Sequence, residues 1–265
     1  MPHPNTRSGR LKICNYSLID SFSRRYLQTY YTKIDQDEFE IAKFLVKEYK
    51  KVKGHPRMLE IGCGPTVHHL FPAVPYVSAI DIADYLKENL EQVRLWKDKQ
   101  ENAHEWNSFT RNVLEFEGKK PSIKDIESRE DKLRKLISNF YFCNVLRDNP
   151  LPCRKKYSMI GFYYCAEEVA IDIGEWGKIM KRASNILLPK GQMFLVALWA
   201  TDHYVINHAN GCEKLPTAYI TKNLMQSTLF KLGFNMKKTT VKVVRTPTQV
   251  HQGIKGVILV SAKKL

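Results

Sequence analysis

The chain has 265 residues, of which 43% are hydrophobic, and a formal net charge of +15. This length and apolar content predict one elaborated domain around a sizeable core. The start of the chain has no apolar leader and no apolar run approaches the length of a membrane span, so we expect neither secretion nor a membrane anchor. Six cysteines without a C-x-x-C pair, and no histidine cluster at zinc spacing, indicate free thiols in a reducing, cytoplasmic setting and no metal site.

The basic excess raises the question of a nucleic-acid partner, because clustered Lys and Arg displace counterions from phosphates. In this sequence the basic residues fall into separate short groups, at 47–53, 154–156 and 237–245. No aromatic residues interleave with these groups, and no recognition helix stands out. A solvated basic surface is therefore expected, with RNA modification as the alternative.

Helical and extended patterns alternate along the chain. A tyrosine-rich segment at 15–33 comes first. Apolar spacing then predicts helices at 35–53, 85–99, 131–137 and 175–187. Apolar runs predict seven strands, at 58–61, 76–80, 139–145, 157–164, 193–199, 241–244 and 256–261. This order predicts an α/β fold with a seven-stranded, mostly parallel sheet, helices on both faces, and a ligand crevice at the C-terminal ends of the strands.

A glycine turn follows the first strand. Gly62 and Gly64 allow a tight turn and a close ligand approach, and Asp84 lies at the tip of the next strand. A glycine turn beside an acid suits a ligand with a ribose. The third glycine of a dinucleotide site is replaced by Val67, and no lysine follows to bind a phosphate. The pattern therefore favours a nucleoside without phosphates.

Four motifs carry a family resemblance: the tyrosine cluster at 25–31, Ile-Gly-Cys-Gly-Pro-Thr at 61–66, Asp-Tyr-Leu-Lys-Glu-Asn-Leu at 84–90 and Leu-Pro-Lys-Gly at 188–191. On these motifs the chain resembles, over nearly its whole length, the small-molecule N-methyltransferases that act on nicotinamide, phenylethanolamine and indolethylamine. The resemblance implies the Rossmann-like fold of class I methyltransferases that use S-adenosylmethionine. We divide the single domain, 1–265, into an N-terminal helical lid at 1–53 and a core at 54–265, with a charged insertion at about 116–139.

The resemblance implies roles toward S-adenosylmethionine. Tyr26 and Tyr31 match tyrosines that close over its carboxylate and sulfonium, and Asp84 matches the acid that accepts from its ribose hydroxyls. Asn144 stands where the family has aspartate, and His68 stands where relatives have tyrosine. The expected cofactor-binding residues are Tyr26, Tyr31, Gly62, Gly64, Thr66, His68, Asp84, Tyr85, Asn89, Asn144, Val145 and Tyr163.

The acceptor must be oriented, shielded from water and freed of its proton. Glu167 and Glu168, directly after the fourth strand, are the expected catalytic carboxylates, and Tyr31 is the third expected catalytic residue. Trp199 stands where the nicotinamide and indolethylamine enzymes place an aspartate, and tryptophan cannot accept a hydrogen bond, so an acceptor other than nicotinamide is implied. The expected acceptor contacts are Tyr30, Tyr164, Trp199 and Tyr204.

The sequence thus predicts a monomeric enzyme that moves a methyl group from S-adenosylmethionine to a small molecule, on nitrogen, without a metal, and that releases S-adenosylhomocysteine. Neither a nucleic acid nor a membrane is expected as a partner. Three alternatives stay open: an RNA or protein methyltransferase, an O- or S-methyltransferase of a small molecule, and a non-catalytic cofactor-binding module in which Trp199 and Tyr163 fill the acceptor pocket.

Overall fold

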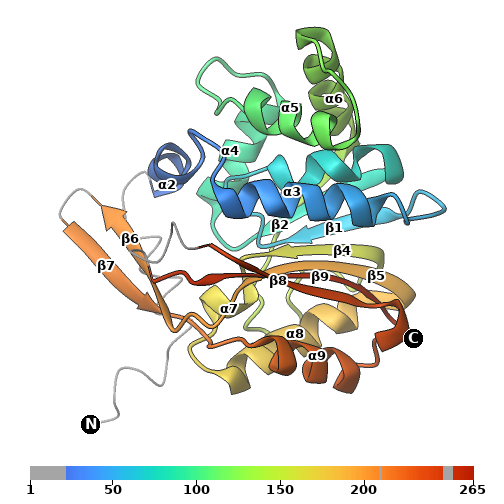
Figure 1. The fold of residues 1–265 in the computed structure, drawn as a ribbon, viewed down its shortest axis with the longest axis vertical. Helices are drawn as coiled ribbons and strands as arrows, with labels where there is room; N and C mark the ends of the chain where they lie inside the picture. Colours follow the sequence, from blue (N-terminus) through green and yellow to red (C-terminus); the bar gives the residue numbers. More distant parts are fainter. Residues whose placement is uncertain (1–21, 209–210, 247–252) are drawn as a thin grey trace.

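The structure is a computed structural model that describes residues 22–208, 211–246 and 253–265. Two helices, α2 (Phe22–Tyr30) and α3 (Gln36–Tyr49), precede an α/β core built on one large sheet (Figure 1). The helix expected at 35–53 is α3, whose apolar side chains pack on the sheet. The alternation of helices and strands in the sequence is therefore found in the molecule.

Seven strands form the central sheet, in the order β3-β2-β1-β4-β5-β9-β8. All neighbours are parallel except that β9 runs antiparallel to both β5 and β8. This confirms the expected seven-stranded, mostly parallel sheet. The strands are β1 (Arg57–Ile61), β2 (Ala79–Asp84), β3 (Ile137–Phe142), β4 (Tyr157–Tyr163), β5 (Leu187–Leu198), β8 (Thr240–Arg245) and β9 (Gly256–Lys263).

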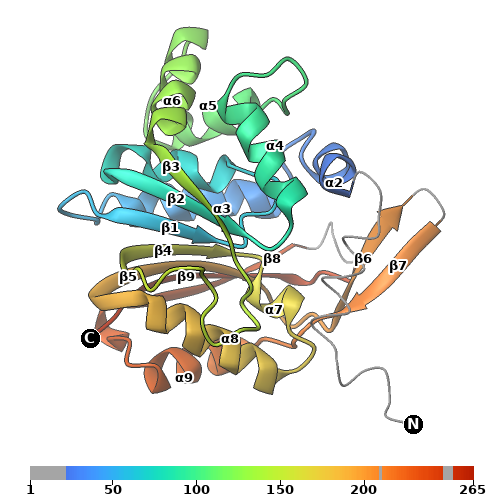
Figure 2. The ribbon, with the colours of Figure 1, turned by 180° about the vertical axis from the view of Figure 1, so that it is seen from behind.

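Helices cover both faces of the sheet (Figures 1 and 2). One face packs against α3, η2, α4, α5 and α6, through a core that includes Leu45, Leu70 and Val93. The other face packs against α7, α8 and α9, through a core that includes Trp176 and Met225. No helix in the described ranges has both the length and the apolar character needed to cross a bilayer. The further helices are η2 (His68–Tyr76), α4 (Lys87–Lys97), α5 (Asn107–Phe116), α6 (Ile123–Leu136), α7 (Ala166–Val169), α8 (Ile173–Ile186), α9 (Lys222–Lys231) and η3 (Met236–Lys238).

The charged segment before β3 is mainly helix. α6 begins at Ile123, eight residues before the helix expected at 131–137. Its start is fixed by a capping box, in which the Ser122 hydroxyl accepts from Asp125 N and the Asp125 carboxylate accepts from Ser122 N. The preceding helix, α5, was not expected from the sequence.

The Leu-Pro-Lys-Gly motif at 188–191 lies within β5 rather than before the strand. Tyr157 of β4 pairs with Leu187, and the next paired residue, Met159, lies opposite Gln192. The pairing register between β4 and β5 therefore shifts across the motif. Residues 188–191 do not pair with β4, and the pairing resumes at Gln192.

A separate hairpin follows β5. Strands β6 (His203–His208) and β7 (Gly211–Pro216) pair antiparallel, with His203 opposite Pro216. The hairpin extends from the sheet on the side where α2 lies (Figures 1 and 2). Neither strand was expected from the sequence.

Candidate active site

A cavity of about 210 Å³ lies at the C-terminal ends of β1, β2 and β4, where an open α/β sheet binds its ligands. Residues of α2 and of the start of α3 form its opposite wall. The cavity brings together most of the residues predicted from the sequence. Those that line it are Tyr26, Tyr30, Tyr31, Gly62, Gly64, Thr66, Asp84, Tyr85, Asn89, Val145, Tyr163, Tyr164 and Glu168.

Asp84 ties the glycine turn to the end of β2. Its Oδ2 accepts from Gly64 N at 2.9 Å, and its Oδ1 accepts from Leu86 N at 2.8 Å and Asn89 Nδ2 at 3.0 Å. Burial raises the pKa of Asp84, and these hydrogen bonds act against that rise. Gly62 and Gly64 have φ values of +65° and +59°, in the left-handed region that favours glycine. The turn and the carboxylate thus form one rigid unit in the cavity wall.

At the end of the cavity beside β2 and β3, Tyr85 and Val145 line the wall, but Asn144 does not. The Asn144 side chain is buried, and its Oδ1 accepts a hydrogen bond from Leu146 N at 3.0 Å. Its amide therefore stabilises its own loop, and its placement does not support the predicted contact with adenine.

Three tyrosines form the wall opposite the sheet. The ring centroid of Tyr26 lies 5.0 Å from that of Tyr30 and 5.6 Å from that of Tyr31. The Tyr30 hydroxyl donates to Val205 O in β6 at 3.1 Å, which joins α2 to the hairpin. Burial raises the pKa of both Tyr26 and Tyr31 well above the ordinary value, so both phenols are neutral.

Two further tyrosines come from the end of β4. The hydroxyls of Tyr163 and Tyr49 lie 2.9 Å apart in a hydrogen bond, and the Tyr164 hydroxyl donates to Asp37 Oδ2 at 2.9 Å. Tyr164 has a φ of +49°, a conformation that costs a non-glycine residue free energy. The packing of α3 against the sheet therefore fixes both rings at the cavity.

The two carboxylates after β4 have different environments. Glu168 lines the cavity. Glu167 does not; its side chain is buried, and its Oε1 accepts a hydrogen bond from Leu198 N at 2.9 Å. This position suits a structural link between α7 and β5, so we assign no catalytic role to Glu167 below.

Two other predicted residues, His68 and Trp199, are also absent from the cavity lining. His68 is buried, with its ring centroid 4.8 Å from that of Tyr31 and 5.0 Å from that of Trp106. Trp199 does not line the cavity, and the Arg245 guanidinium lies 5.7 Å from the centroid of its ring. Tyr204 belongs to β6, and its side chain lies outside the described part of the structure.

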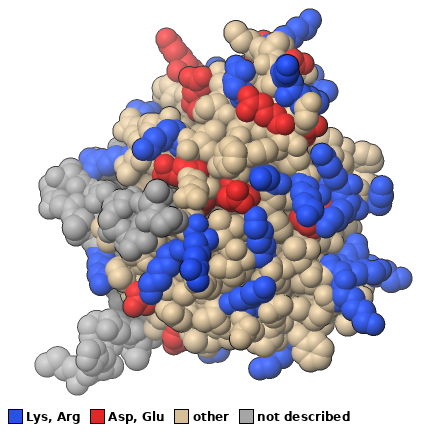
Figure 3. All heavy atoms as spheres, in the orientation of Figure 1, with Lys and Arg blue, Asp and Glu red and all other residues tan. Residues whose placement is uncertain are grey.

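The acidic character of the cavity was largely not predicted from the sequence. Asp35, Asp37 and Glu38 line it together with Asp84 and Glu168, and none of the described lining residues is a lysine or an arginine. On the face of the molecule seen in Figure 3, Lys and Arg form several separate groups rather than one patch. A chain of net charge +15 therefore keeps an acidic cavity.

The sequence of this chain matches one known family over nearly its whole length. The profile of the NNMT/PNMT/TEMT family matches residues 14–265. The chain belongs to the NNMT/PNMT/TEMT family. Indolethylamine N-methyltransferase of Mus musculus is 25% identical over 222 residues, which cover 80% of this chain and 81% of that protein. Nicotinamide N-methyltransferase of Homo sapiens is 24% identical over 225 residues, which cover 81% of this chain and 82% of that protein. Phenylethanolamine N-methyltransferase of Homo sapiens is 21% identical over 215 residues, which cover 78% of this chain and 73% of that protein.

Solved structures show that this NNMT/PNMT/TEMT family member has a methyltransferase fold. The Burkholderia thailandensis 1,6-didemethyltoxoflavin-N1-methyltransferase, solved with 1,6-didemethyltoxoflavin and S-adenosylhomocysteine, has a TM-score of 0.54 at 13% identity, covering 100% of this chain and 92% of that one. The DhpI-SAM-HEP complex has a TM-score of 0.56 at 9% identity, covering 99% of both chains. These matches confirm the Rossmann-like class I fold expected from the sequence.

Proposed function

We propose that this family member transfers the methyl group of S-adenosylmethionine to a nitrogen atom of a small molecule. The observation that carries the proposal is the acidic cavity, with five carboxylates and, among its described residues, no basic side chain other than His69. A sulfonium and an ammonium acceptor are both cations, which such a cavity attracts, whereas it repels phosphates. The three relatives described above are N-methyltransferases by name.

The cavity suits an adenosine cofactor without phosphates. Asp84 would accept from the ribose hydroxyls, beside the turn where glycine lets the ligand approach the backbone. Tyr85 and Val145 line the adenine end. Tyr26 and Tyr31 lie on the opposite wall, where their rings can attract the sulfonium cation.

The chemistry required of the protein is positioning and proton removal. Bound S-adenosylmethionine supplies an activated methyl group, which a nitrogen lone pair accepts as the carbon–sulfur bond breaks. Glu168 lines the cavity and is the carboxylate we assign to take the proton of an ammonium acceptor. The tyrosines of α2 exclude water once both ligands are bound. The sulfonium is already activated, so we propose a reaction that requires no metal.

We propose a basic amine as the acceptor, rather than neutral nicotinamide. Tyr30, Tyr164 and Glu168 line the cavity together and combine aromatic rings with a carboxylate. Aromatic faces and a carboxylate are the groups that bind an ammonium ion.

The cysteines support a cytoplasmic location as part of the proposal. Cys63, Cys143, Cys153 and Cys165, the cysteines that the structure describes as free, form no disulfide. Free thiols persist in a reducing compartment. We also propose that the enzyme works as a monomer and without a nucleic-acid partner.

Calorimetry with three ligands tests the cofactor. We expect purified protein to bind S-adenosylmethionine and S-adenosylhomocysteine and to give no heat with NAD. Binding of NAD alone would refute the proposed function. A panel of amines, carboxylic acids and nicotinamide, assayed for S-adenosylhomocysteine release, then tests the acceptor class; turnover confined to acids or to nicotinamide would contradict it.

Asp84→Ala should weaken binding of S-adenosylhomocysteine by about 1–3 kcal/mol, because a buried carboxylate acceptor and the support of Gly64 N are both lost. Titration calorimetry measures the change. Glu91→Ala is the control, since that residue lies on the exposed side of α4. Unchanged affinity in the Asp84 variant would remove this residue from the binding site.

A further inference from the structure

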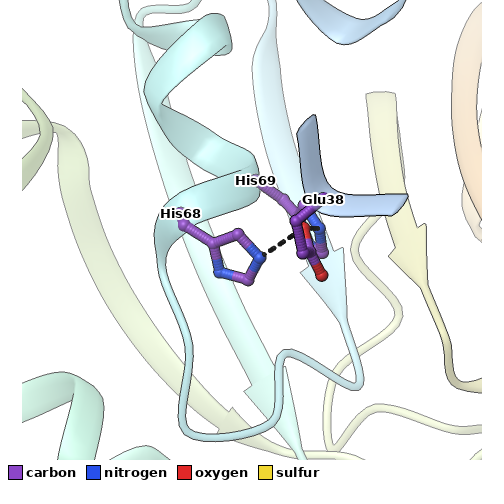
Figure 4. Close-up of side chains that lie close together, drawn as sticks. All are labelled: Glu38, His68 and His69. Atoms are coloured by element: carbon purple, nitrogen blue, oxygen red, sulfur yellow. Dashed lines mark hydrogen bonds and ion pairs between the residues drawn. The ribbon is translucent and has the colours of Figure 1, made fainter. Parts of the chain in front are cut away.

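Three side chains form a buried cluster at one end of the cavity (Figure 4). Glu38 comes from α3, and His68 and His69 come from the start of η2. Glu38 Oε2 lies 2.9 Å from Nε2 of each histidine. The exposed fractions of the residues are 7%, 5% and 5%. Glu38 and His69 line the cavity, and His68 lies behind them.

The hydrogen bonds fix which atoms carry protons. Burial acts to raise the pKa of Glu38, but the two imidazoles hold it below its ordinary value, so Glu38 is an ionised carboxylate that can only accept. Both Nε2 atoms must then be donors. Burial, together with the neighbouring His69, lowers the pKa of His68 to about 4, so His68 is neutral at pH 7, and its bare Nδ1 has no hydrogen-bond partner among the described residues.

Glu38 places an ionised carboxylate at the cavity wall. No lysine or arginine in the described ranges forms an ion pair with Glu38. Its Oε2 is used by the histidines, and its Oε1 accepts no hydrogen bond from any described residue. A buried carboxylate is stable only with compensating donors or a cation. The two histidine donors occupy only Oε2, so Oε1 is available to a cationic N–H donor from a ligand in the cavity.

The cluster and Asp84 lie on opposite sides of the glycine turn. β1 is flanked by β2 on one side and by β4 on the other. Asp84 ends β2, whereas the His69 ring centroid lies 4.7 Å from that of Tyr163, which ends β4. A ligand with its ribose at Asp84 crosses the turn after β1 and brings its other end toward the cluster. In S-adenosylmethionine that end is the amino acid, with its α-ammonium group.

We propose that Glu38 binds the α-ammonium of the cofactor's amino acid, and that His68 and His69 are positioning residues that hold its carboxylate. This inference rests on the proposed function. The sulfonium is a poorer match, because it has no N–H to donate and is joined to the ribose, close to Asp84. The acceptor amine is assigned to Glu168, a different carboxylate of the lining.

Three ligands that differ only at the amino-acid end test the proposal without any acceptor. They are S-adenosylhomocysteine, its analogue without the α-amino group, and 5′-methylthioadenosine, which lacks the amino acid altogether. We expect the wild-type protein to bind S-adenosylhomocysteine at least about tenfold more tightly than the deamino analogue. Glu38→Gln should reduce that ratio to less than about threefold while leaving binding of 5′-methylthioadenosine unchanged.

Glu40→Gln provides the matched control. This residue lies two positions further along α3, and its carboxylate pairs with Lys242 at the surface at 2.8 Å. The Glu40→Gln variant should keep the wild-type ratio of affinities for S-adenosylhomocysteine and the deamino analogue. Should Glu38→Gln not fold, Glu38→Asp keeps the charge but withdraws it from the cavity, and it should lose the same discrimination.

The outcomes separate this inference from the proposed function. A wild-type protein that binds none of the three ligands overturns the proposed function, and this inference with it. Tight S-adenosylhomocysteine binding with an unchanged ratio in both Glu38 variants overturns the inference alone. An equal loss of affinity for all three ligands in the Glu38 variants also overturns the inference, because it would show that Glu38 has a structural role. Zinc that copurifies at one ion per chain and is lost in Glu38→Gln would identify a metal site instead.

Discussion

Gly62→Ala is expected to cost about 2–5 kcal/mol of unfolding free energy and to abolish cofactor binding. An added Cβ would lie 2.3 Å from Cys165 Sγ and 2.8 Å from Cys165 Cβ. The residue also has a φ of +65°, which is unfavourable for alanine. The first turn of the binding loop would therefore have to move away from β4.

Gly64→Ala is the matched comparison within the same turn. Its φ of +59° is equally unfavourable, but an added Cβ would have no heavy atom of any described residue beyond its chain neighbours within 4 Å. We expect only the backbone cost, about 1–2 kcal/mol. Urea unfolding and calorimetry with S-adenosylhomocysteine measure both effects. Cys165→Ala in the Gly62→Ala background removes the Sγ contact and should recover part of the stability; equal costs for the two glycine variants would contradict the steric explanation.

The glycine turn shows why one part of the site is predictable from sequence. Gly62, Gly64 and Asp84 act through local geometry: a strand, a turn with positive φ, and the tip of the adjacent strand. Each step depends on neighbours in the chain or on the pairing of β1 with β2. The same reasoning identified the sheet, because apolar runs separated by helical patterns leave few topologies open.

The cluster around Glu38 shows where prediction from sequence ends. Glu38 meets His68 and His69 only because α3 packs on η2, and about thirty residues separate them in the chain. No local pattern marks that contact. The neighbours Glu167 and Glu168 pose a similar problem, since tertiary packing alone turns the first toward Leu198 N and the second toward the cavity.

The hairpin after β5 did have a signal in the sequence. Asn-Gly at 210–211 is a strong sequence marker of a hairpin turn, and Gly211 is the first residue of β7. The flanking residues lack clear alternation of apolar and polar side chains, so periodicity did not mark either strand. Turn chemistry was thus a better guide there than periodicity.

Asp81→Ala is expected to lower the free energy of unfolding by about 2–4 kcal/mol, less than for a fully buried ion pair, because the Arg57 and Lys155 side chains are each 36% exposed. Asp81 lies in β2 with no exposed surface. Its carboxylate accepts from Arg57 at 2.5 and 3.0 Å, Lys155 at 2.8 Å, Asn139 at 2.8 Å and Tyr157 at 2.7 Å. These donors come from β1, β3, β4 and the loop before β4, so removing the acceptor leaves cations and buried donors unpaired across half the sheet.

The same cluster makes stability depend on pH. Burial acts to raise the pKa of Asp81, but its hydrogen bonds hold that pKa well below the ordinary value. A carboxyl whose pKa is lower in the folded than in the unfolded state stabilises the fold above the unfolded pKa, near 4 for aspartate, and loses that contribution as the pH falls further. We therefore measure the free energy of unfolding in urea at about pH 7 and about pH 3. The wild type should be much more stable than Asp81→Asn at pH 7, and this difference in unfolding free energy should be smaller at pH 3. Asp148→Asn, which breaks an exposed pair with Arg182, should change stability by less than about 1 kcal/mol at either pH. A gap that stayed constant between the two pH values would show that Asp81 acts by packing rather than by charge.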